Sequence, residues 1–164
     1  MTDSRAPRGA LVPLRLYLGG AFLKAASGKI GANWNPWPDW MAGVIHDRMP
    51  TSVPVYRAFL VSVVLPHVAF FAHAVACGEV VVGCLLVAGL TTRGAAVGGM
   101  FLTLNYLLLN GAAQLVPGHP GVFALGSNDP VFVLGCLALL IGSAGRAFGV
   151  DYFLRRRFPG WPLS

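Results

Sequence analysis

The sequence feature that most constrains the fold is a long apolar run that contains a single acidic residue. No Lys or Arg occurs from Ala58 to Thr92, and Glu79, the only glutamate in the chain, lies near the middle of this run. A carboxylate inside a hydrophobic helix is costly unless it has a partner or a function. Any fold proposed for this chain must therefore provide an environment for Glu79.

The overall composition predicts a single-domain integral membrane protein. Of the 164 residues, 55% are hydrophobic and only 11% are charged, whereas a soluble domain averages roughly 25% charged residues. The net charge of +6 is not accompanied by a basic and aromatic surface pattern, so we expect no nucleic-acid partner. The three cysteines do not form a disulfide framework, because Cys77 and Cys84 are too far apart on one helix.

The apolar runs predict an all-α fold, an integral membrane four-helix bundle. Its spans are expected at about 11–30, 67–90, 94–114 and 131–149, with an interfacial loop over 31–65 and a basic tail over 150–164. Within the loop, a helix from Val53 to about Leu65 is expected to end at Pro66. Because this helix is too short to span, we interpret it as a re-entrant or interfacial segment between the first two spans.

The distribution of basic residues predicts the orientation. More Lys and Arg lie on the side of the two termini than on the opposite side, so both termini are expected to be cytoplasmic. Aromatic and basic side chains near the span ends are expected to contact membrane lipids; these are Trp34, Trp37, Trp40, Arg155, Arg156, Arg157 and Trp161.

Glu79 is the foremost candidate for chemistry, and Arg15 on the first helix is its expected partner. Two interpretations remain open for this pair. It is either a structural ion pair that holds two helices together, or a proton-handling or quinone-facing site, because intramembrane carboxylates are frequent in proton relays. We also expect Arg93, Arg146 and Asp151 to form an ion-paired rim at the cytoplasmic end.

Other polar residues in the apolar runs are candidate quinone contacts or packing residues. These are His67, His73, Asn105 and Tyr106. His67 and His73 do not follow the helical spacing of a metal-binding pair, and His73 with Cys77 would supply only two ligands. We therefore expect no metal site and no covalently bound cofactor, with quinone as the one candidate cofactor.

The stretch from Gly78 to Gly111, GEVVVGCLLVAGLTTRGAAVGGMFLTLNYLLLNG, resembles the DoxX/DoxD family of small bacterial membrane proteins. LRLYLGGAFLKAASGKI near the start and NDPVFVLGCLALLIGSAGRAFGVDYFL near the end fit the same resemblance. It implies four helices and a bacterial inner membrane. DoxD-type members are described as the membrane subunit of thiosulfate:quinone oxidoreductase. The matching positions suit structural as well as catalytic roles; they are Arg15, Gly78, Glu79, Arg93, Asn105, Gly149 and Asp151.

Two functional hypotheses follow. In the first, the chain is the membrane subunit of an oxidoreductase or electron-transfer system and presents quinone to a soluble or periplasmic partner. In the second, it is a non-catalytic subunit that packs against a larger respiratory or photosynthetic membrane complex.

Overall fold

The computed structural model describes residues 9–50, 52–110, 129–142 and 149–151, and these residues form helices joined by turns, with no strand among them. The α-helices are α1 (Val12–Ser27), α2 (Trp37–Arg48), α3 (Pro54–Phe59), α4 (Val68–Ala88), α5 (Thr92–Asn110) and α6 (Asp129–Gly142). Shorter helical segments are η1 (Gly31–Asn33), the π-helical η2 (Leu60–Val64) and η3 (Leu65–His67). The predicted all-α class is confirmed.

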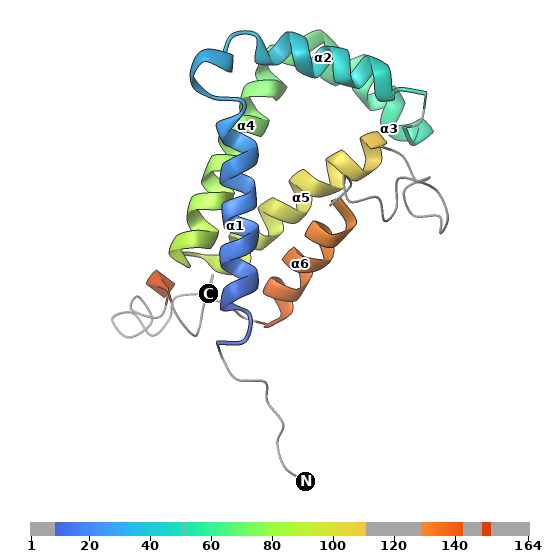
Figure 1. The fold of residues 1–164 in the computed structure, drawn as a ribbon. Coiled ribbons are helices and arrows are strands. Elements are labelled where there is room, and N and C mark those ends of the chain that lie inside the picture. Colours follow the sequence, from blue (N-terminus) through green and yellow to red (C-terminus); the bar gives the residue numbers. More distant parts are fainter. Residues whose placement is uncertain (1–8, 51, 111–128, 143–148, 152–164) are drawn as a thin grey trace.

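Four of the helices form the body of the molecule. α1 packs against α4, α4 against α5, and α5 against α6, while α1 also contacts α6. α2 lies across one end of this group, above α1 and α4 in Figure 1, and contacts α4. The largest group of buried apolar side chains lies among α1, α4, α5 and α6, and a smaller group lies beneath α2 around Ile45, Leu60 and Val64.

The predicted helix end at Pro66 is wrong, because the helix continues from Pro54 to Ala88. In η2 the N–H of Leu65 donates to the carbonyl of Leu60, five residues back, which widens the turn before the proline. Pro66 then lies in the short η3 segment, and His67 has φ −122° and ψ 33°, outside the helical region. The helix therefore changes character at Pro66 without stopping there.

Only the run Pro54–Ala88 is long and apolar enough, among the described helices, to qualify by itself as a membrane span. α1 has 16 residues, which corresponds to about 24 Å, less than the ~30 Å of a bilayer core. Pro130–Gly142 in α6 is apolar but shorter. The arrangement of four spans accordingly stays a prediction.

Glycines allow α1 and α4 to approach very closely. A Cβ atom on Gly19 would lie 3.1 Å from the carbonyl oxygen of Gly83, and one on Gly83 would lie 3.0 Å from the carbonyl oxygen of Gly19. On α5, a Cβ on Gly99 would lie 3.1 Å from Cys136 Sγ, whereas one on Gly94 would meet nothing within 4 Å. The small residues of α5 thus make their close contact with α6 toward the middle of the helix and not at its start.

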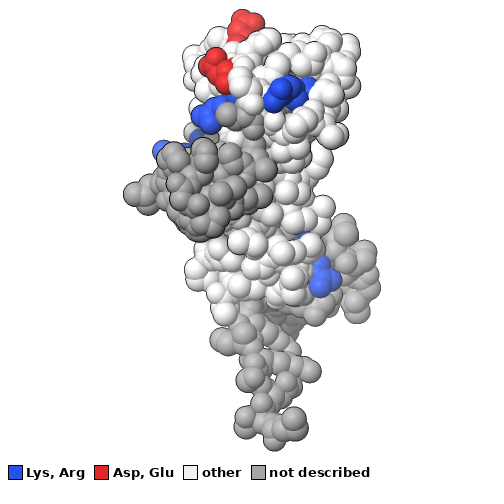
Figure 2. All heavy atoms as spheres, turned by 90° about the vertical axis from the view of Figure 1, so that its right-hand side faces the viewer, with Lys and Arg blue, Asp and Glu red and all other residues white. Residues whose placement is uncertain are grey.

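The outward faces of the helices are apolar. Phe70, Phe101 and Ile141 are largely exposed, as are many aliphatic side chains of α4, α5 and α6. On the face shown in Figure 2, the charged side chains of the described residues lie toward the two ends, with uncharged surface between them. An uncharged band between charged ends is the surface that a bilayer requires.

Candidate functional site

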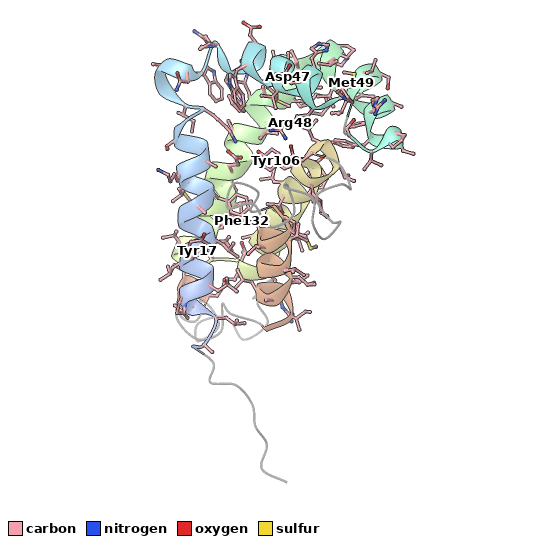
Figure 3. All side chains as sticks on the ribbon, turned by 45° about the vertical axis from the view of Figure 1, so that its right-hand side comes forward. Tyr17, Asp47, Arg48, Met49, Tyr106 and Phe132 are labelled. Atoms are coloured by element: carbon pink, nitrogen blue, oxygen red, sulfur yellow. The ribbon has the colours of Figure 1, made fainter. Side chains whose placement is uncertain are left out.

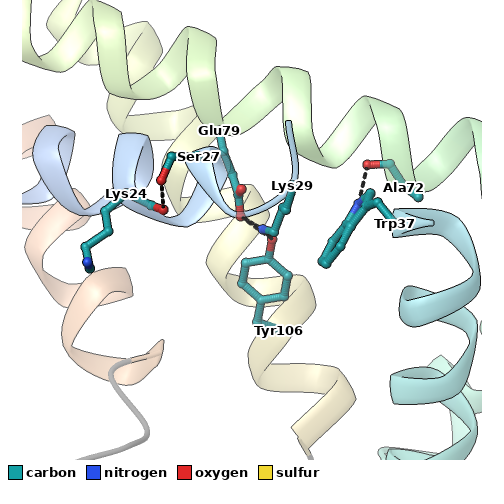
Figure 4. Close-up of polar contacts among 7 residues, drawn as sticks. All are labelled: Lys24, Ser27, Lys29, Trp37, Ala72, Glu79 and Tyr106. Atoms are coloured by element: carbon teal, nitrogen blue, oxygen red, sulfur yellow. Dashed lines mark hydrogen bonds and ion pairs between the residues drawn. The ribbon is translucent and has the colours of Figure 1, made fainter. Parts of the chain in front are cut away.

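The site centres on Glu79, which lies in the middle of α4 with a side chain only 1% exposed. Lys29 Nζ forms an ion pair with Oε1 of this carboxylate and donates a hydrogen bond to it. The hydroxyl of Tyr106, on α5, donates to the same oxygen over 2.5 Å. Lys29 Nζ also lies 3.3 Å from the Tyr106 hydroxyl, so the three side chains form one network (Figure 4).

Lys29 reaches this network because α1 ends early. The helix ends at Ser27, and Gly28 and Lys29 form a turn before η1. The Lys29 ammonium lies 5.0 Å from the ring centroid of Trp37 and 5.6 Å from that of Tyr106. Aromatic faces attract a cation. The two rings and the Glu79 carboxylate therefore stabilise the charge of the Lys29 ammonium.

The expected pairing of Glu79 with Arg15 is wrong. The Arg15 guanidinium lies at the C-terminal end of α4. A Cβ atom placed on Gly89 would lie 2.6 Å from its Nη1. Gly89 is about 15 Å along the helix axis from Glu79 at the α-helical rise. The charge that acts on Arg15 is that of Asp151. The sequence estimate failed because it matched only the depths of the two charges, whereas the turn after α1 brings a nearer cation.

Asp151 is a second buried carboxylate, and it caps the start of α5. Its Oδ1 accepts a hydrogen bond from the backbone N–H of Thr91 over 2.8 Å, and its Oδ2 accepts one from that of Thr92 over 3.0 Å. The Thr92 hydroxyl is a further donor, 3.2 Å from Oδ2. Of the predicted rim of Arg93, Arg146 and Asp151, Asp151 lies near Arg15, Arg93 is in the first turn of α5, and Arg146 lies outside the described residues.

A cavity of about 690 Å³ lies beside Glu79. Most of its lining is apolar or aromatic and comes from α1, with Phe132 from α6 and with Thr103 and Tyr106 from α5. Figure 3 shows Tyr17, Tyr106 and Phe132 on three different helices around this region. Glu79 Oε2 is buried and has no hydrogen-bond partner among the described residues. The cavity therefore adjoins a carboxylate of which only one oxygen is paired.

Two further cavities flank the network. One of about 430 Å³ lies under Lys29 and is lined by Trp37 and Trp40, while one of about 270 Å³ is lined mainly by apolar side chains of α2, η2, α4 and α5. Tyr106 contributes to both the Glu79 cavity and this last one. Tyr106 thus separates a cavity with a charged wall from an apolar one.

Of the four candidate quinone contacts, only Tyr106 lies with Glu79. The His73 ring stacks on Trp34 at 4.0 Å, and its Nε2 is 3.1 Å from the Trp34 carbonyl oxygen. Asn105 accepts a hydrogen bond from the Tyr56 hydroxyl over 2.9 Å and borders the apolar cavity. His67 is exposed at the start of α4 and lines none of the three cavities.

The tryptophans predicted at the membrane interface also hold the fold together. Trp37 Nε1 donates to the Ala72 carbonyl over 3.0 Å, which ties α2 to α4, and its ring stacks on Trp40 at 4.8 Å. Trp40 remains 59% exposed. Arg155, Arg156, Arg157 and Trp161 lie outside the described residues.

Sequence reasoning missed the role of Lys29. This residue is the last basic side chain before the tryptophan-rich segment, a position from which a lysine is expected to extend toward the membrane interface. The signal that could have identified it is Gly28, because glycine just after a helical run is typical of a helix end. A helix that ends there turns the next side chain back toward its neighbours.

The described residues form helices with apolar outer faces, one of them long and apolar enough to span a membrane, and bury a charge network between them; these features fit a membrane protein. The chain belongs to the DoxX family, whose model matches residues 10–111, from the start of α1 to the end of α5. No curated protein and no solved structure matches the chain. The recognised family is thus confirmed, while α6 lies beyond the matched residues.

Proposed function

We propose that this protein is the membrane subunit of an oxidoreductase and that the cavity beside Glu79 receives the ring of a quinone. The observation that carries the proposal is a large, mainly apolar cavity with one buried carboxylate in its wall. Binding sites for small molecules are typically apolar with a few convergent polar groups that orient the ligand. A quinone suits such a site, because it has a ring with two polar oxygens and an apolar tail.

The cavity is accessible from the apolar surface of the molecule. Leu16 and Tyr17 line it, and they are 45% and 61% exposed. A molecule dissolved in the bilayer therefore reaches the cavity without crossing water. Lys24 also lines it and is exposed near the end of α1, so a cation is available where the cavity approaches the polar boundary.

The proposed setting is the bacterial inner membrane. α1, α4, α5 and α6 form the four spans, α2 and α3 lie at one interface, and both termini are cytoplasmic. Electrons exchanged with the quinone come from or pass to a protein partner, soluble or periplasmic. The tryptophans of 34–40 and the basic residues of the tail contact membrane lipids.

A scaffold function is the second candidate, and the Lys29–Glu79–Tyr106 network favours it. These side chains join the turn after α1 to α4 and α5, so they also suit a purely structural lock. In that case the chain packs against a larger respiratory or photosynthetic membrane complex, and the cavity holds only lipid.

The two functions are separated by obstructing the cavity. A Cβ on Gly20, which lines the cavity, meets nothing within 4 Å, and neither does one on Gly43 of α2, which lies outside it. Gly20→Trp therefore fills the cavity, and Gly43→Trp is its matched control. In lipid nanodiscs, we expect a short-chain quinone to bind the wild type and Gly43→Trp, and to lose at least about ten-fold in affinity for Gly20→Trp. Equal affinities, or no quinone binding to any of them, would support the scaffold function.

A further inference from the structure

We propose that the cavity beside Glu79 holds one anionic phospholipid when no quinone occupies it. The lipid phosphate lies at Lys24, and one acyl chain lies along the apolar wall near Tyr17 and Phe132. This inference goes beyond the proposed function, because it assigns a second class of ligand to the cavity and applies to an oxidoreductase subunit and to a scaffold alike.

Lys24 gives the mouth of the cavity a positive charge. It is exposed in the last turn of α1 and lines the cavity. The other charged residue of the lining is Glu79, whose charge Lys29 balances. Figure 4 shows the Lys24 side chain pointing away from this pair, and its ammonium has no acidic partner among the described residues. The charge at the mouth is therefore open to an anion from outside the protein.

The mouth lies at the level where lipid phosphates are found. Ala25, next to Lys24, lines both this cavity and the one formed by Trp37 and Trp40. Exposed tryptophans such as Trp40, which is 59% exposed, are typical of the head-group level of a bilayer. A lysine near a helix end extends its ammonium toward the same level. Lipid phosphates are therefore within reach of Lys24 in the proposed membrane setting.

The rest of the cavity suits an acyl chain. Tyr17 lies seven residues before Lys24, about 10.5 Å deeper along the helix axis, and its side chain is 61% exposed. Between them, a Cβ atom on Gly20 would meet nothing within 4 Å, which leaves room beside α1. Phe22 and Phe132 belong to the apolar wall and meet edge to face with centroids 5.9 Å apart. A phospholipid has the same order of parts, an anion followed by an apolar chain, whereas a free phosphate would leave this wall uncovered.

The end of α1 favours a head group with a net negative charge over a zwitterionic one. The carbonyl oxygens at the C-terminal end of a helix attract cations, such as the amine of a zwitterionic head group. Here two of them already accept hydrogen bonds: that of Lys24 from the Ser27 hydroxyl over 2.8 Å, and that of Gly28 from Asn33 Nδ2 over 3.0 Å. The amine therefore gains little at this site, while the Lys24 ammonium attracts the negative charge.

Photolabelling in lipid nanodiscs tests the site. A phosphatidylglycerol with a diazirine in its acyl chain is compared with the phosphatidylcholine that carries the same chain, and the label on residues 16–25 is quantified by mass spectrometry. Labelling of Val81 and Ile141, which are exposed and line none of the three cavities, serves as the internal reference for lipid that merely surrounds the protein. Relative to that reference, we expect about five-fold more label from phosphatidylglycerol, the factor that one lysine near anionic lipid supplies.

Variants assign the preference to Lys24 and the label to the cavity. Lys24→Met is expected to reduce the preference to within about two-fold, and Lys24→Arg, which keeps the charge, is expected to retain it. Arg48→Met, which removes an exposed cation on α2 outside the three cavities, is the matched control and is expected to behave as the wild type. Gly20→Trp, which fills the cavity, is expected to lower the label on residues 16–25 to the level of the reference positions.

The inference is wrong if phosphatidylglycerol shows no excess in the wild type, if Lys24→Met keeps the excess, or if soluble glycerol phosphate, which has no acyl chain, abolishes the labelling. The last result would assign the mouth to a free phosphate. A short-chain quinone in excess should displace the lipid, and a quinone that Gly20→Trp excludes but that leaves the lipid label unchanged would place the lipid elsewhere. If the lipid is selected but no quinone binds, the proposed quinone site fails and this inference stands. If quinone binds as expected without any lipid selection, only the proposed function stands.

Discussion

The two buried carboxylates of this protein, Glu79 and Asp151, use their oxygens in different ways. Both side chains are almost completely buried, with exposures of 1% and 0%, and each has a cation nearby. Asp151 accepts hydrogen bonds at both oxygens, two of them from the backbone at the start of α5. Glu79 accepts two at one oxygen, while the described residues provide none for the other.

The difference indicates which carboxylate is closed on the protein and which borders a cavity. The Asp151 network closes on the protein itself: its carboxylate satisfies N–H groups that a helix start leaves unpaired, and its N–H donates to the Gly89 carbonyl over 2.9 Å. Glu79 lines a cavity, and its Oε2 is buried without a donor among the described residues. The number of satisfied oxygens, more than burial or charge, therefore distinguishes the two sites.

The largest effect is expected from Asp151→Ala. Loss of this carboxylate leaves two backbone N–H groups at the start of α5 without their acceptor and leaves Arg15 without its nearby charge. Breaking a buried charged network typically costs about 3–5 kcal/mol in the free energy of unfolding. Denaturant or SDS unfolding in mixed micelles measures it.

Asp47→Ala serves as the control for Asp151→Ala, since Asp47 is exposed and surface substitutions usually change stability by less than about 0.5 kcal/mol. The contrast between the two carboxylates would be broken by an Asp151→Ala protein that unfolds like the wild type. It would be broken equally by one that keeps its stability but loses quinone binding, because Asp151 would then belong to the ligand site.

The sequence predicts the helices and the importance of Glu79 better than it predicts the contacts of Glu79. Apolar runs and a lone carboxylate are local signals, so the all-α class and Glu79 as the residue in need of a partner follow directly from them. The partner depends on where α1 ends and how the chain turns at Gly28, which is a tertiary outcome. In the same way, Asp151 is predicted near the end of a helix, but its capping of α5 requires two distant segments to meet.

An intermediate effect is expected from Lys29→Met. Among the described residues, this change leaves the Glu79 carboxylate with Tyr106 as its remaining donor. About 2 kcal/mol of stability should be lost, less than for a fully broken buried pair. Lys29→Met/Glu79→Gln should recover about half of that loss or more, since no buried charge then lacks a partner. A double-mutant cycle on unfolding free energies measures the coupling.

Lys24→Met is the matched control for Lys29→Met, because Lys24 is exposed near the end of α1, five residues before Lys29, and its loss should change stability by less than about 0.5 kcal/mol. If the two lysine variants are equally stable, or if the double variant is no more stable than Lys29→Met, the ion pair contributes nothing to the free energy of unfolding. Glu79 would then contribute no more to stability than a surface carboxylate.

The smallest effect is expected from Tyr106→Phe, which is also the most specific test of the comparison between Glu79 and Asp151. It removes a single hydroxyl that donates to Glu79 Oε1, for which a loss of about 1–2 kcal/mol in stability is typical. Tyr17→Phe, which removes a hydroxyl from a side chain 61% exposed in the same cavity lining, should leave stability unchanged. A Tyr106→Phe protein that is as stable as the wild type would show that this hydroxyl contributes nothing to holding Glu79, and the comparison with the fully bonded Asp151 would then lose its basis.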